Sequence, residues 1–178
     1  MHLQRKINIA LTGGIGTGKT YISKQFLDMG IPVFYADEET KKLYSSEEVI
    51  AFFKEKFKDT FFTYNKLDFS KLSDFVFSDI EHRKQIEAFI HPLVMKQFKE
   101  WSLQQVSNIV MLESAIIFEA GLESYFDKIM VVDAPLEVRV KRIRERNPHW
   151  SEIDIMQRIH SQLPQEEKCN RADLVINN

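Results

Sequence analysis

Residues 13–20 read Gly-Gly-Ile-Gly-Thr-Gly-Lys-Thr and match the pattern GxxxxGK[ST] of a phosphate-binding P-loop. Its glycines let backbone N–H groups turn inward around a polyphosphate, Lys19 can reach the β- and γ-phosphates, and Thr20 offers a hydroxyl to Mg²⁺. An apolar run at residues 7–11 precedes the motif, and a segment able to form a helix, residues 21–29, follows it. We predict that a nucleoside triphosphate is bound by Gly14, Gly16, Thr17, Gly18, Lys19, Thr20 and Tyr21.

The glycines fit a dinucleotide fingerprint poorly. The pattern GxGxxG started at Gly14 would need glycine where Lys19 stands, and started at Gly16 it would need glycine at Tyr21. A merely flexible turn is also disfavoured, because the strand, the loop, the Lys-Thr pair and the helix occur together. The motif therefore favours a triphosphate over NAD.

Composition indicates a compact protein that needs no disulfide or structural metal to stabilise its core. With 178 residues and 44% hydrophobic content, the chain can bury a sizeable core. A net charge of −2 argues against a protein that coats nucleic acid, and the single cysteine, Cys169, fits a reducing compartment. No apolar run approaches the roughly 18 residues needed to cross a bilayer, and the start has no room for a signal peptide. We expect a cytoplasmic monomer or weak homo-oligomer without nucleic-acid or membrane partners.

Alternating strand-like and helix-like segments predict an α/β fold. The pattern indicates a five-stranded parallel sheet with helices on both faces. The expected strands are residues 7–11, 31–35, 109–112, 129–132 and 174–176.

The middle of the chain loses this alternation. Apolar residues there recur at helical spacing, which predicts a helical insertion with a loop or small hairpin at residues 59–68. Such an insertion is often a substrate domain. We predict a nucleotide-binding core at 1–37 and 108–178, a substrate domain at 38–107, and a lid at 147–165 within the core.

Three carboxylates are placed to do chemistry. Asp37 follows the second expected strand, where it can accept the proton of an attacking hydroxyl or hold the water shell of Mg²⁺; alternatively it caps the helix that starts at Glu38. Glu113 ends the third expected strand, where a metal-orienting carboxylate stands in P-loop kinases, and Glu119 is the second candidate. Solvated loop carboxylates are the alternative for both.

A basic helix begins after Pro135. In P-loop kinases an arginine on this helix and others on a closing lid neutralise charge during phosphoryl transfer, and Arg142 and Arg146 are the candidates. Asn147 to Glu152 would interrupt the helix, with Ser151 capping the next one and Arg158 as a further phosphate ligand. The remaining basic side chains are predicted to be solvated: Arg139, Lys141 and Arg144.

Further landmarks extend over nearly the whole chain. They are residues 11–20, residues 30–33 leading to Ala36-Asp37, His91-Pro92-Leu93, Phe118-Glu119, Gln162, residues 166–168 and residues 172–176. In their order and spacing the chain resembles the dephospho-CoA kinase family.

The resemblance implies transfer of the γ-phosphoryl group of ATP, with Mg²⁺, to the ribose 3′-hydroxyl of dephospho-CoA, the last step of CoA biosynthesis. It implies Asp37 as general base, with Lys19 and Arg142 as the other catalytic groups. Expected substrate contacts are Thr12, Asp37, His91 and Glu119, and expected metal ligands are Thr20 and Glu113. His91-Pro92 could equally be a structural helix stop, since proline disfavours helix in the residue before it.

The chain departs from the family pattern in three places. Tyr35 stands where the family has Asp, Glu113 and Ala115 stand where it has Asp and Pro, and its members usually continue past the last strand into another helix.

Two other functions stay open. One is another small-molecule kinase, with a nucleoside, nucleotide or shikimate-like acceptor; His91-Pro92 and the C-terminal block speak against it. The other is a P-loop switch protein, weakened by the lack of a guanine-reading NKxD sequence.

Overall fold

The computed structural model describes residues 5–58, 60–63, 66–68, 71–72 and 80–178. The chain divides into two compact units, which we call the core unit (residues 1–35 and 100–178) and the insertion unit (residues 36–99). The assignment of the insertion unit to substrate binding stays a prediction.

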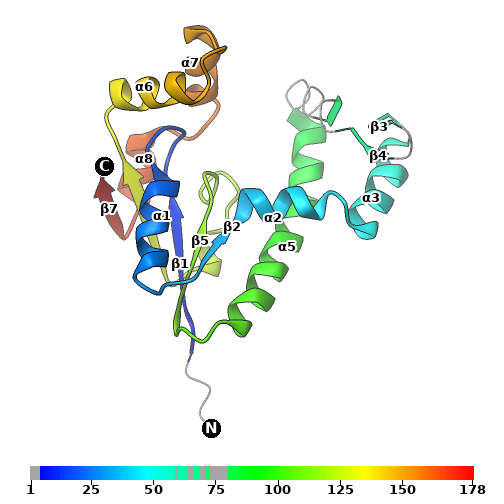
Figure 1. Cartoon of the computed structure of the whole chain (residues 1–178). Helices are drawn as coiled ribbons and strands as arrows, with labels where there is room; N and C mark the ends of the chain where they lie inside the picture. The colour runs from blue at the N-terminus through cyan, green and yellow to red at the C-terminus, as the bar shows by residue number, and fades with distance from the viewer. Residues whose placement is uncertain (1–4, 59, 64–65, 69–70, 73–79) are drawn as a thin grey trace. The chain divides into compact units, whose positions relative to one another are not determined.

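The core unit is built on a five-stranded sheet in which every pairing is parallel, in the order β2-β5-β1-β6-β7 (Figure 1). The central strand β1 is buried from Ile9 onward, as expected for a strand covered on both faces. The predicted α/β fold is confirmed. The strands are β1 (Ile7–Thr12), β2 (Val33–Tyr35), β5 (Ile109–Glu113), β6 (Lys128–Asp133) and β7 (Leu174–Asn177).

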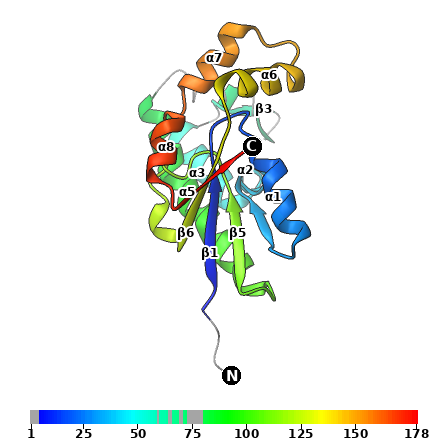
Figure 2. The same ribbon diagram turned by 90° about the vertical axis from the view of Figure 1, so that its left-hand side faces the viewer.

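Helices lie on both sides of this sheet. Figure 2 shows α1 (Lys19–Asp28) and α8 (Gln165–Arg171) on opposite sides of it. Ile22 of α1 is buried in a cluster with Leu11 and Met111, and burying such a side chain is worth about 1.5–3 kcal/mol. Between β5 and β6 lies the 3-10 helix η1 (Glu123–Tyr125), and after β6 come α6 (Leu136–Arg146) and α7 (Glu152–His160).

The end of α1 fixes where β2 starts. Gly30 has φ 84°, its N–H donates to Leu27 O at 2.9 Å, and the N–H of Ile31 donates to Phe26 O at 3.0 Å. These two bonds form a Schellman motif, which needs a left-handed residue at the position of Gly30. The chain therefore reverses here and returns along the sheet as β2.

The insertion unit holds α2 (Ala36–Leu43), α3 (Glu47–Phe57) and most of α5 (Ile80–Gln104). The predicted small hairpin is confirmed by the antiparallel pair β3 (Phe62–Thr63) and β4 (Lys66–Leu67). Phe53 and Phe61 are buried, with ring centroids 5.9 Å apart, and the ring of Phe52 stacks on Phe89 at 3.8 Å. This unit therefore has an aromatic core of its own.

Helix α5 is 25 residues long and continues through Pro92 without a break. The reading of His91-Pro92 as a helix stop is therefore wrong. An internal proline costs about 3 kcal/mol, which burial of apolar side chains at every fourth position can offset. The buried side chains at this spacing in α5 are Ile86, Ile90, Val94 and Phe98.

Among the described residues, no helix is long and apolar enough to cross a membrane.

His91 of α5 is half-buried. Burial lowers the pKa of its imidazole, Glu87 acts in the opposite direction, and Arg83 lowers the pKa further. The neutral form of His91 is therefore favoured in the folded protein.

This shift predicts a pH-dependent stability. Because the pKa of His91 is lower in the folded chain than its ordinary value near 6.5, the unfolded chain binds the extra proton in the interval between the two values. The stabilisation is complete above about pH 6.5 and declines as pH falls below it. His91→Gln should flatten this part of the pH dependence, measured by urea unfolding between pH 7.5 and 5. The control is His149→Gln, at an exposed position; an unchanged slope in His91→Gln would contradict the prediction.

Candidate active site

The P-loop joins the carboxyl end of β1 to the start of α1. Gly16 has φ 83°, and a Cβ there would lie 2.7 Å from the carbonyl oxygen and 3.0 Å from the Cα of Arg139. Both the backbone angle and the contact exclude a side chain at this position. The glycines are therefore required where the loop passes α6.

Two residues predicted to hold a metal lie together. The hydroxyl of Thr20 donates to the carboxylate of Glu113 at 3.3 Å. Strand register explains the meeting: Glu113 pairs with Leu11 at the carboxyl end of the sheet, beside the P-loop. Glu113 is only 8% exposed, so its carboxylate is directed to this site rather than to bulk water.

Lys19 folds over its own loop. Its ammonium donates to the carbonyl oxygens of Gly13 at 2.9 Å and Gly14 at 3.3 Å. These bonds place the cation over the concave backbone that the motif predicts for phosphate.

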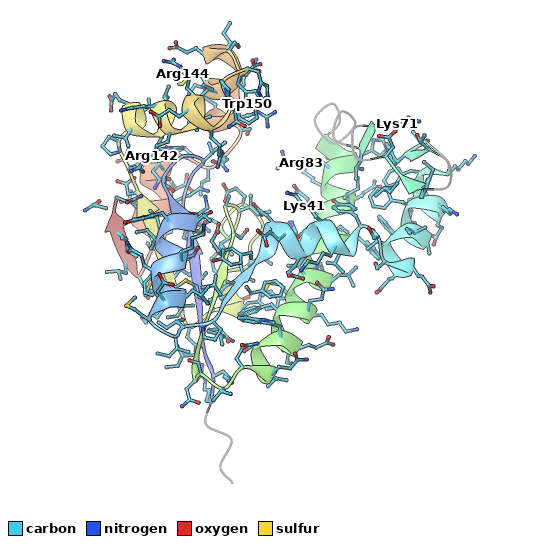
Figure 3. All side chains as sticks on the ribbon, viewed as in Figure 1. Lys41, Lys71, Arg83, Arg142, Arg144 and Trp150 are labelled. Carbon is cyan, nitrogen blue, oxygen red and sulfur yellow. The ribbon has the colours of Figure 1, made fainter. Side chains whose placement is uncertain are left out.

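Donors from other elements hold the remaining carbonyls of the loop. Arg139 Nε donates to Ile15 O at 3.0 Å, Arg142 Nη1 to Thr17 O at 3.2 Å, and Asn178 Nδ2 also to Thr17 O at 2.9 Å. Figure 3 shows Arg142 on the side of α6 that faces the sheet. These long-range donors fix the back of the loop.

Arg139 corrects one prediction. It was expected to be solvated but is only 6% exposed, because it faces the P-loop, and burial lowers its pKa while Asp133 acts in the opposite direction. Arg139 was missed although a signal was present, because it stands four residues before the buried Ile143 and so shares its face of the helix. Lys141 and Arg144 are exposed, as predicted.

The segment predicted as a lid has its own internal order. Ser151 caps α7 through a capping box with Asp154, which confirms the predicted cap. The guanidinium of Arg158 lies 4.0 Å from the ring centroid of Trp150, a cation–π contact that holds this arginine. Arg146 is exposed at the end of α6.

Two glutamines bind the P-loop from the segment around the start of α8. Gln162 Oε1 accepts from Ile15 N and Gln165 Oε1 accepts from Gly14 N, both at 2.8 Å. Gln165 Nε2 also donates to Val132 O at 2.9 Å. Sequence reasoning gave neither residue a role, since no local pattern relates a glutamine to a loop about 150 residues earlier.

Glu119 is engaged within the core unit. It pairs with Lys168 at 2.6 Å and accepts from Leu163 N at 3.0 Å. Burial lowers the pKa of Lys168, whereas the bond to Glu119 raises it. A contact of Glu119 with substrate stays a prediction.

The surroundings of the other predicted site residues, Asp37, Thr12 and His91, differ from one another. Asp37 lies in the first turn of α2, which begins at Ala36, so the alternative role as a cap before Glu38 is wrong. Its side chain is exposed and has no hydrogen-bond partner among the described residues. Thr12 is fully buried, and its hydroxyl also has no partner within the described ranges. The catalytic and substrate roles of Asp37, Thr12 and His91 stay predictions.

Comparison with known proteins gives one consistent result. The family model for dephospho-CoA kinase matches residues 7–178. A dephospho-CoA kinase of Bacteroides fragilis strain YCH46 is 41% identical, covering 97% of this chain and 84% of the relative. The crystal structure of TT1252 from Thermus thermophilus has a TM-score of 0.88 at 33% identity, covering 98% of this chain and 89% of that one. A dephospho-CoA kinase from Campylobacter jejuni has a TM-score of 0.66 at 26% identity, covering 96% and 87%.

The contact between Gly16 and Arg139 predicts a stability difference between two glycines. Gly16 and Gly30 have nearly the same φ, 83° and 84°, but a Cβ at Gly30 would meet nothing within 4 Å. Gly30→Ala should lower the free energy of unfolding by about 1–2 kcal/mol from backbone strain alone. Gly16→Ala should lower the free energy of unfolding by about 1–3 kcal/mol more than that, because its methyl group also clashes with the backbone of Arg139. Urea unfolding of both variants measures the difference, and equal losses would mean that the loop moves away from α6 at little cost.

Proposed function

The chain belongs to the dephospho-CoA kinase family, and from this membership we propose how its own residues carry out the family's reaction. The enzyme is an ATP-dependent kinase that transfers the γ-phosphoryl group to the ribose 3′-hydroxyl of dephospho-CoA, giving CoA and ADP. The observation that carries the proposal is the P-loop with Lys19 over it and the Thr20–Glu113 pair beside it.

Gly14, Gly16, Thr17 and Gly18 form the loop that receives ATP, followed by Tyr21 in the first turn of α1. The Gly14 and Ile15 amides are already bonded to glutamines, so the phosphates are met by amides farther along the loop and by Lys19. Lys19 exchanges its carbonyl partners for phosphate oxygens, which carry full negative charge.

The residues beside the loop fit Mg²⁺. The ion prefers oxygen ligands and is usually bound by one or two carboxylates together with substrate phosphates. Thr20 and Glu113 offer a hydroxyl and a carboxylate 3.3 Å apart. We propose that they hold it directly or through water. Held by Thr20 and Glu113, the ion would offset the negative charge of the phosphates during transfer.

Arginines neutralise the charge that develops on the transferred group. Arg142 already reaches the P-loop from α6, at 3.2 Å from Thr17 O. We propose that Arg142 turns toward the phosphates, and that Arg146 and Arg158 join it when the segment 147–165 closes as a lid. Trp150 keeps the guanidinium of Arg158 in place for this step.

Asp37 is the proposed general base. It comes two residues after Tyr35, whose strand β2 pairs with β5 at Glu113. Its carboxylate, exposed in the first turn of α2, can accept the proton of the 3′-hydroxyl as that oxygen attacks the γ-phosphorus. Thr12, His91 and Glu119 are the further proposed acceptor contacts. Tyr35, where the family has Asp, instead accepts a hydrogen bond from Ser23 at 3.4 Å.

The experiment that tests the function compares acceptors. Purified protein is given Mg-ATP with dephospho-CoA, with a panel of nucleosides and shikimate, or with no acceptor, and ADP and product mass are measured. Stimulation by dephospho-CoA alone, with CoA as product, is expected. Stimulation by another acceptor would overturn the assignment of dephospho-CoA as substrate but keep the assignment as a kinase. ATP hydrolysis at a rate that no acceptor changes would favour a switch protein. We also propose a cytoplasmic location, in keeping with the single cysteine.

The role of Asp37 predicts a selective loss of turnover. Asp37→Asn should lower kcat by about 10²-fold or more, the usual effect of losing a general base, and leave ATP affinity close to that of the wild type. The matched control is Glu38→Gln, which removes the next exposed carboxylate of the same helical turn and should keep normal turnover. Steady-state kinetics and ATP binding decide, and near-normal kcat in Asp37→Asn would remove this residue from catalysis.

A further inference from the structure

The core unit contains a buried ammonium that the reaction does not use. Lys168 is 0% exposed, and its Nζ bonds to Glu119 at 2.6 Å and to Ala115 O at 2.7 Å. Burying a charge is costly unless it is paired and fully hydrogen-bonded, and a well-packed apolar side chain would often serve stability as well. Its position therefore calls for a role other than stability alone.

The carboxylate of the pair has a second partner. Glu119 also accepts from the backbone N–H of Leu163 at 3.0 Å. Glu119 and Lys168 thus tie the segment from residue 162 to 168 to the loop that follows β5. This tie acts on the backbone next to Gln162, not only on side chains.

The tied segment is the one that holds the P-loop. Gln162 and Gln165 flank Leu163 and accept from Ile15 N and Gly14 N, both at 2.8 Å. The bonds from the P-loop to Gln162 and Gln165 keep their lengths only if the backbone that carries the two glutamines is fixed. The Glu119–Lys168 pair fixes this backbone. Helix α7 ends at His160, so the same anchor holds residues 162–165, the last part of the proposed lid, and only the part before them is left to close.

We propose that the ion pair between buried Lys168 and Glu119 is a positioning device for ATP binding, which holds Gln162 and Gln165 against the P-loop and so keeps the loop in its phosphate-binding shape. Neither charged residue needs to touch the nucleotide. The proposal rests on ATP binding at the P-loop, as in the proposed function. It also gives Glu119 a second task beside the proposed contact with the acceptor.

The first test measures the Kd of Mg-ATP and the urea midpoint of each variant, at a temperature where the variant is folded. Lys168→Met keeps the apolar stem and removes the charge; losing a hydrogen bond between charged groups should weaken ATP binding about tenfold or more. Lys168→Arg should restore much of the affinity. The matched control is Lys128→Met, which breaks an exposed pair with Asp173 in the same unit and should leave Kd unchanged.

A double-mutant cycle separates positioning from general destabilisation. If Lys168 acts through Gln162, then Lys168→Met combined with Gln162→Leu should bind ATP about as weakly as the weaker single variant. The proposal would be overturned if the factors by which the two single substitutions raise the Kd for ATP were multiplied in the double variant. It would also be overturned if Lys168→Met lowered the urea midpoint but kept the Kd of the wild type. Should Lys168→Met not fold, Glu119→Gln, which keeps the side-chain volume, decides by the same criteria.

Glu119→Gln also distinguishes the two tasks of Glu119. Positioning predicts a raised Kd for ATP, and contact with the acceptor predicts a raised KM for dephospho-CoA; an unchanged Kd for ATP would overturn the positioning role. Failure of the proposed function would instead appear as absent ATP binding by the wild-type protein.

Discussion

A glycine loop that binds phosphate must leave backbone N–H groups open to the ligand while every other polar group of the loop finds a partner. An unsatisfied buried backbone group costs about 1–3 kcal/mol, and glycines supply no side chains of their own to prevent this. The loop between β1 and α1 therefore depends on donors and acceptors brought by other elements. They are Arg139 and Arg142 of α6, Gln162 and Gln165 beside and in α8, and Asn178 after β7.

This dependence explains why polar side chains are buried so close to the sheet. Arg139 and Lys168 are 6% and 0% exposed, and each has hydrogen bonds to backbone carbonyls. A buried polar network specifies one arrangement when all its members are satisfied and destabilises the fold when one is missing. The geometry of the phosphate site is therefore determined as much by these partners as by the motif itself.

Local patterns in the sequence predicted the parts of the structure that local physics determines. The P-loop, the five strands and the cap at Ser151 each depend on neighbouring residues, and all are present. The approach of Glu113 to Thr20 could be predicted because parallel strands end at one edge.

Other features depend on contacts between distant residues. Nothing near Gln162 or Gln165 indicates which way these side chains turn, and the burial of Lys168 needs Glu119, 49 positions earlier, as its partner. Pro92 shows the same limit in a helix, because its local preference to end the helix is overcome by buried side chains on the same face.

The order of these contacts along the chain has a consequence for synthesis on the ribosome. The P-loop is made before the side chains that hold it, because Gln162, Gln165 and Asn178 follow their loop partners by 147, 151 and 161 residues. Among the described strands, β7 pairs with β6 alone, so this edge of the sheet also forms after the P-loop has been made. A nascent chain that already displays the whole glycine motif thus still lacks the groups that shape it, and the nucleotide site cannot take its final form before Asn178 has been made.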